Sequence, residues 1–192
     1  MVQDDTHAKS STKITRTYES LETSGNDFRV FDDSSQTSYD QKDAIRALDD
    51  NGQPFVPERS GEQPRDTADS LSPFPGVTAS DIVSHILKWL TEFRKSKLIS
   101  TTDNLMWALW EALRRILRNG SRVVTLFAIS IPDRLMSSII RVKALPLLRR
   151  MRGSEVKRAI GFSLWSSEHL YYLQIPSECV VWHQSFTLQA SI

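Results

Sequence analysis

The feature that most constrains this chain is residues 97–115, KLISTTDNLMWALWEALRR, where an apolar lead-in gives way to hydroxyl side chains and then to an amphipathic segment. The hydroxyl cluster and the two polar residues after it can accept hydrogen bonds from the free N–H groups of a helix start. Apolar residues then recur at helical spacing, at Leu105, Leu109, Ala112, Leu113 and Ile116. By itself the pattern predicts a capped core helix that ends at Asn119-Gly120.

Other segments predict a mixture of helices and strands. Thr78 to Asp81 forms a capping box, and the apolar spacing after it predicts a helix as far as Phe93. Val123 to Ile129 is an uncharged, β-branched and aromatic run, which is typical of a buried central strand. Shorter strands are expected at residues 28–31, 169–176, 180–182 and 186–188, and helices at 134–153, divided by Pro146, and at 154–160. The fold class is therefore α+β.

A chain of 192 residues fits one domain. Residues 1–27 have few large apolar groups, so we expect a disordered N-terminal tail there and a folded domain over 28–192. Residues 36–77 are polar and rich in Pro and Gly, which predicts a long loop with at most a brief helix at 43–48.

Charge is divided unevenly along the chain. Residues 1–80 carry 15 acidic and 8 basic side chains, and residues 81–192 carry 8 acidic and 16 basic side chains. The basic half leaves open a domain that binds nucleic acid or an acidic protein, although no known nucleic-acid motif accompanies it. The single cysteine, Cys179, and the absence of a secretory signal or membrane span predict an intracellular protein, cytoplasmic or nuclear. Histidines and the cysteine show no metal-ligand spacing, so no metal is expected.

Three polar features stand at the edges of strand-like runs: Arg29 in FRVFD, the cluster Ser100-Thr101-Thr102, and Glu168 in SEHLYYLQIPSE. No histidine or cysteine adjoins them as a general base, so the sequence does not predict a hydrolytic triad. Arginine can bind a phosphate or ribose oxygen, hydroxyls can orient a ligand, and a glutamate can stabilise an oxocarbenium-like sugar. That chemistry would suit cleavage of an N-glycosidic bond.

The segments FRVFD, LISTTDNLMWAL and SEHLYYLQIPSECVVW together resemble the three motifs of the ADP-ribosyltransferase fold in its arginine, serine, glutamate class. The likeness is to the heat-labile enterotoxin and pierisin branch and to uncharacterised fungal domains, and it covers residues 28–182. It implies a split β-sheet core with flanking helices and NAD as the substrate. It also implies mono-ADP-ribosyl transfer or NAD glycohydrolysis.

By this resemblance, Glu168 would be the catalytic residue, and Arg29, Ser100, Thr101 and Thr102 would bind NAD. Thr102 stands where the family has a serine, and Ser166 stands two residues before Glu168, where members that modify arginine or guanine carry Glu or Gln. The resemblance therefore implies no particular acceptor, which would be a protein or a nucleic acid.

Plainer interpretations remain open. Arg29 could pair with Asp32 or Asp33 at a sheet edge, Ser100 could cap a helix, and Glu168 could be a solvated turn residue. The chain could also keep the fold as a catalytically inactive interaction module.

Overall fold

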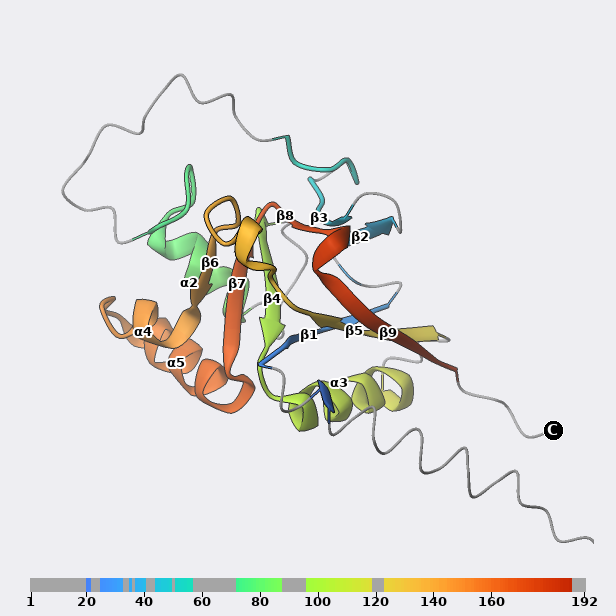
Figure 1. The fold of residues 1–192 in the computed structure, drawn as a ribbon. Coiled ribbons are helices and arrows are strands. Elements are labelled where there is room, and N and C mark those ends of the chain that lie inside the picture. The colour runs from blue at the N-terminus through green and yellow to red at the C-terminus, as the bar shows by residue number, and fades with distance from the viewer. Residues whose placement is uncertain are drawn as a thin grey trace, which may run out of the picture.

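The computed structural model describes residues 20–21, 25–32, 35, 37–40, 44–49, 51–56, 72–87, 96–118 and 123–187. Within these ranges the chain is an α+β domain (Figure 1). The strands are β1 Asp27–Phe31, β2 Thr37–Asp40, β3 Ala44–Ala47, β4 Leu98–Thr102, β5 Val123–Ile129, β6 Arg141–Lys143, β7 Glu168–Tyr172, β8 Gln174–Pro176 and β9 Val180–Thr187. The α-helices are α2 Ala79–Leu87, α3 Leu105–Arg118, α4 Ala144–Leu148 and α5 Ser154–Ser166, and short 3-10 helices occupy Asp133–Leu135 and Ser177–Cys179. No described helix is long and apolar enough to cross a membrane.

The strands form two antiparallel sheets. The larger has the order β6-β7-β4-β1-β5-β9, and the smaller has the order β2-β3-β8. Strand β1 pairs with β5 at five positions, but its register with β4 consists of the single pair Phe28–Thr102. Beyond that pair β1 and β4 diverge, so the large sheet is split in its middle.

Helix α3 covers the β1–β5 part of the large sheet (Figure 1). Its residues Leu105, Ala108 and Ala112 are buried against Phe28 and Leu126 in one core cluster. Burial of one apolar stripe of a helix against a sheet is the ordinary source of helix stability in a protein. The predicted helix is thus confirmed, although its N-terminal cap is Asn104, whose Oδ1 accepts the Trp107 N–H at 3.0 Å. Ser100, Thr101 and Thr102 belong to β4 instead.

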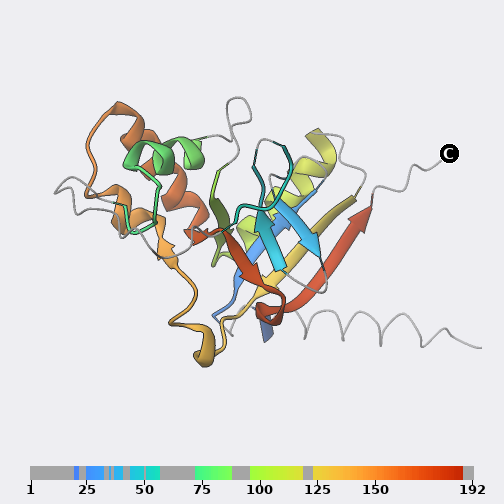
Figure 2. The same ribbon diagram turned by 90° about the horizontal axis from the view of Figure 1, so that it is seen from above.

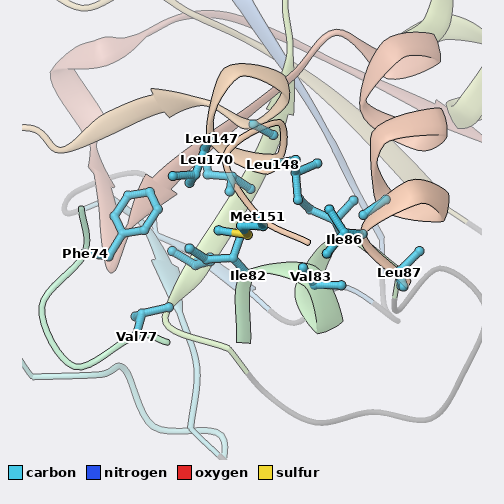
Figure 3. Close-up of a cluster of buried hydrophobic side chains, with 14 residues drawn as sticks. Phe74, Val77, Ile82, Val83, Ile86, Leu87, Leu147, Leu148, Met151 and Leu170 are labelled. Carbon is cyan, nitrogen blue, oxygen red and sulfur yellow. The ribbon is translucent and has the colours of Figure 1, made fainter. Parts of the chain in front are cut away.

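Helices α2, α4 and α5 cover the β4–β7 part of the sheet. Figure 3 shows Ile82 and Ile86 of α2 packed beside Leu148, Met151 and Leu170. The predicted capping box is confirmed, because Thr78 Oγ1 accepts the Asp81 N–H at 3.2 Å and Asp81 Oδ2 accepts the Thr78 N–H at 2.9 Å. Residues 88–93, the rest of that predicted helix, lie outside the described ranges.

The small sheet packs on the large sheet, on the face opposite to the one that the helices cover (Figure 2). Ile45 and Ile175 from the small sheet meet Ile99, Phe127 and Tyr171 from the large sheet, and all five are buried. Two of these strands lie in the stretch 36–77 that the sequence predicts as a loop, and the brief helix expected at 43–48 is wrong, since residues 44–47 form β3. Their alternating pattern is only four residues long, which is too short to separate from a polar loop.

The other predicted elements are mostly confirmed. Val123–Ile129 is the interior strand β5, and the last predicted strands form β7, β8 and one continuous β9. The helix expected before Pro146 is wrong, because Asp133–Leu135 form a 3-10 helix and Arg141–Lys143 form β6. Pro146 does not divide two helices, because it lies inside the first turn of α4, where a missing N–H costs nothing. Helix α5 runs six residues beyond its expected end at Ile160.

The domain begins before the predicted boundary at residue 28. Asp27 opens β1 and Leu21 packs in the α3 cluster, whereas residues 1–19 lie outside the described part of the chain. Asp27 is buried and accepts hydrogen bonds from Arg141 Nε at 2.7 Å, Arg141 Nη2 at 2.6 Å and the Tyr171 hydroxyl at 2.5 Å. The His169 Nδ1 lies 2.9 Å from the same carboxylate. This Asp27 cluster ties β1, β6 and β7 together.

Asp27→Asn should lower the free energy of unfolding by about 3 kcal/mol, because it leaves the Arg141 charge without its buried partner. Burial raises the pKa of Asp27, but the hydrogen bonds from His169 and Arg141 outweigh burial and hold it well below its ordinary value. The stability that the carboxylate contributes is therefore complete above pH about 4 and is lost as the pH falls below that value. Urea unfolding at neutral and acid pH measures both effects.

The matched control is Glu178→Gln, which removes the exposed partner of Arg134 away from the Asp27 cluster and should have little effect on stability. Equal costs for the two variants would show that the Asp27 cluster does not hold the strands together.

Candidate functional site

The split between β1 and β4 contains the candidate site. Arg29, Ser100 and Glu168 come from β1, β4 and β7, and all three line one cavity. Arg29 Nη1 donates to the Ser100 carbonyl at 2.6 Å, and the Ser100 hydroxyl donates a short hydrogen bond to Glu168 Oε1. Arg29 lies 71 positions and Glu168 lies 68 positions from Ser100 in the sequence, and the structure brings both residues into direct contact with Ser100.

Glu168 owes its position to the abrupt end of α5. Ser167 adopts a left-handed conformation with φ 47° and turns the chain directly into β7, so that Glu168 is the first residue of that strand. Its side chain is buried, with Ser163 Oγ 3.5 Å from Oε2 on the side away from Ser100. Burial raises the pKa of Glu168 from 4.5 to about 7, against the Ser100 hydrogen bond and the charge of Arg29. A carboxyl group that titrates near neutral pH is typical of functional sites.

Arg29 is held beside the split by two hydrogen bonds. Besides Ser100, it donates from Nη2 to Thr37 Oγ1 of β2 at 3.2 Å. Its Nε is buried and has no hydrogen-bond partner among the described residues. Burial and the nearby charge of Arg115 lower the pKa of Arg29 to about 10, so it stays cationic at neutral pH. Arg29 therefore offers an unused donor and a positive charge to an oxygen-rich ligand.

The two threonines of the cluster have different roles. Thr102 Oγ1 donates to the Ser166 carbonyl and accepts the Asn104 N–H at 2.9 Å, which fixes the end of β4 against the end of α5. Thr101 turns its hydroxyl toward Asp27, 3.4 Å away, on the other face of the sheet. Side chains alternate across a strand, so the hydroxyls of Ser100 and Thr102 share one face of β4 and that of Thr101 lies on the other, although Thr101 is also among the residues that line the cavity.

His85 is part of the site, although the sequence analysis found no histidine beside the cluster. Its Nε2 lies 2.8 Å from the Ser100 hydroxyl oxygen. That hydroxyl therefore lies between an imidazole and a carboxylate. The sequence signal was slight, because His85 stands next to the apolar stripe of α2 and no spacing rule connects that helix to β4.

A second group of charges lies along α3. Arg115 donates to Asp32 Oδ1 at 2.9 Å and to Glu111 Oε1 at 2.8 Å, and Glu111 also binds Arg114. Asp32 thus pairs with Arg115, whereas Arg29 engages Ser100 and Thr37. Glu111 and Arg115 both line the cavity, and their spacing of four residues on one helix is the signal that could have linked them.

The contacts of Ser100 decide which chemistry the site favours. A serine nucleophile with a histidine base needs a third group that orients the histidine. Here the carboxylate of Glu168 contacts the serine, and the serine separates it from His85. The arrangement presents an oriented, buried carboxylate beside a cationic arginine. No set of three or more His, Cys, Asp or Glu side chains suited to a metal ion occurs in the described part of the chain.

The matching family model is described as a domain of unknown function, DUF7587, and it spans residues 25–190. The chain belongs to this family. No curated protein matches the sequence. The family span includes β1 through β9, and with them every residue of the candidate site.

Glu168→Gln should stabilise the protein at pH 8. The folded-state pKa of Glu168 is raised above the unfolded value, so the stability gained from its bound proton is present below pH 4.5 and lost as the pH rises to about 7. An amide of the same shape avoids this loss, and the variant should exceed the wild type by about 3 kcal/mol at pH 8 and by little at pH 4.5. Thermal and urea unfolding across this range measure the difference.

Glu178→Gln changes an exposed glutamate and serves as the matched control, with little pH dependence expected. A Glu168→Gln variant whose stability follows the wild type at every pH would contradict the raised pKa.

Proposed function

We propose that this chain is an NAD-dependent mono-ADP-ribosyltransferase or NAD glycohydrolase, which cleaves the bond between nicotinamide and ribose. The observation that carries the proposal is the convergence of Arg29, Ser100 and Glu168 in one cavity, with Ser100 in direct contact with both of the others. The motifs that resemble the arginine, serine, glutamate class supply the same three residues. The split antiparallel sheet is compatible with the fold which that resemblance implies.

In the proposed reaction the bond from the nicotinamide nitrogen to the ribose C1′ breaks, and its electron pair leaves with neutral nicotinamide. Positive charge then develops on the ribose, and ionised Glu168 stabilises it in a buried environment, where such a charge is worth more than in water. Water or an acceptor attacks C1′ and loses a proton. Ser100 orients the Glu168 carboxylate, and His85 holds the Ser100 hydroxyl from the other side.

Arg29 is the proposed ligand of a phosphate or ribose oxygen, because its buried Nε lacks an acceptor among the described residues. The cavity itself contains about 30 Å³, which is room for about two water molecules. Entry of the nicotinamide ribose would therefore require side chains of the wall to move. Trp107 and Phe162 line this wall and also line the groove outside it, so they are the side chains that we expect to move.

A catalytically inactive interaction module is the second candidate. The small volume of the cavity favours it, and so does Ser166, which is buried and donates to the Phe162 carbonyl at 3.0 Å. Ser166 therefore offers no carboxylate or amide to an acceptor.

Purified protein should release nicotinamide from NAD, with cell extract present to supply an acceptor. Glu168→Gln should lower the rate about a hundredfold or more, because it removes the charge that stabilises the transition state. Chromatographic quantification of nicotinamide measures the rate, and Glu178→Gln should leave it unchanged. Absence of release, together with no effect of NAD on the melting temperature, would favour the inactive module.

The rate at low NAD concentration should rise with pH through about 7, because Glu168 must be ionised and its pKa lies there. A histidine titrates in the same range, so the profile is measured also on His85→Gln, whose amide can replace the imidazole Nε2 as a donor to Ser100. If Glu168 is the group responsible, the rise remains in His85→Gln. Its disappearance would assign the rise to His85 instead.

A further inference from the structure

Helix α3 is apolar on two faces. Leu105, Ala108 and Ala112 are buried in the core, whereas a second set of apolar side chains on α3 points to solvent. This outward stripe consists of Met106, Trp110, Leu113 and Leu117, which are 67%, 55%, 53% and 65% exposed. The spacing of four, three and four residues aligns them along one side of the helix. A core helix needs only its buried stripe, so the outward stripe is unexplained by the fold.

The end of α5 extends the same surface. Leu164 and Trp165 are 54% and 79% exposed. Between α3 and α5 lies a groove of about 660 Å³, lined by Trp107, Trp110, Arg158, Gly161, Phe162 and Trp165. Figure 1 shows the end of α5 beside the start of α3. We call the outward stripe of α3, this groove and Leu164 the α3–α5 face. Large contiguous apolar surfaces of this kind are typical of protein interaction sites, and tryptophan and arginine are the residues that contribute most to binding there.

Three exposed basic side chains lie in or beside the α3–α5 face, and one exposed glutamate, Glu155, lies one turn before Arg158 on α5. Arg158 is the charged residue that lines the groove, and Lys157 beside it is exposed. Arg118 is exposed in the last turn of α3, where the outward stripe ends. The one glutamate of α3, Glu111, is buried and already binds Arg114 and Arg115. A partner that places acidic side chains beside its apolar ones would therefore be favoured.

We propose that the α3–α5 face binds an acidic amphipathic helix of another protein. The outward stripe offers apolar side chains at helical spacing, and the groove between α3 and α5 can receive one large apolar side chain of the partner. A second copy of this chain is disfavoured as the occupant, because a two-fold contact through the same face would bring its basic side chains together. A cationic ligand is disfavoured by Arg158.

The bound helix would lie next to the candidate site. Trp107 and Phe162 line both the groove and the cavity that contains Glu168. The proposal does not depend on the proposed catalysis, and binding can be measured without NAD.

The test is selection from a phage library of helix-forming peptides on the wild-type protein, with counter-selection on Leu113→Glu. Leu113 is more than half exposed, so this variant should fold normally, which its melting temperature verifies. Selected peptides should carry apolar residues at helical spacing and a net negative charge. Titration of one such synthetic peptide should show affinity at least about tenfold weaker for both Leu113→Glu and Arg158→Glu.

Met136→Glu is the matched control, because Met136 is 62% exposed but lies beyond β5, outside the α3–α5 face. It should bind the peptide as the wild type does. Selection of neutral or basic peptides, no selection at all, or equal weakening by Met136→Glu would overturn the proposal. Self-association in sedimentation equilibrium that Leu113→Glu abolishes would also overturn it, in favour of a second copy.

Discussion

Strands β1 and β4 separate beyond the pair Phe28–Thr102, and the space between them has to be filled by side chains that replace the missing strand contacts. Arg29 does this by donating to the Ser100 carbonyl, and its positive charge in turn lies near the buried carboxylate of Glu168. Each of these groups would be costly to bury alone. Together they are tolerated, because each supplies a hydrogen bond or an opposite charge that another requires. The site is therefore a direct consequence of the split.

The two faces of β4 and β7 carry different polar groups. Ser100 and Glu168 face the helices, whereas Thr101 and His169 face Asp27 on the other side. The Asp27 cluster is satisfied by strong hydrogen bonds, and its carboxylate stays ionised. Glu168 has weaker compensation, and its pKa is raised. Strands β4 and β7 thus contact one carboxylate, Asp27 of β1, that stays ionised, and β7 carries a second one, Glu168, whose ionisation costs stability.

Sequence patterns identified the elements whose signals are local. The capping box of α2, the uncharged run of β5 and the apolar stripe of α3 were all predicted, and Arg29 was placed in a strand. Ser100 was assigned to the start of a helix and Glu168 to the residue before a strand, although both lie in strands. Contacts that depend on how the helices and strands pack together could not be predicted from the sequence. His85 reaches Ser100 only because α2 lies over β4, and Arg115 pairs with Asp32 across 83 positions of the sequence. Asp27 was assigned to a tail, because an acidic residue after a polar segment gives no sign of burial.

Side-chain alternation in β4 also bears on how this family can change during evolution. Removal of one residue before Ser100 would bring Thr101 to the helix side and turn Ser100 toward Asp27, so that a single deletion would dismantle both polar clusters at once. A substitution at one of these positions changes a single side chain, whereas a change of length moves every side chain that follows it in the strand to the other face. We therefore expect insertions and deletions among relatives to avoid β4 and β7.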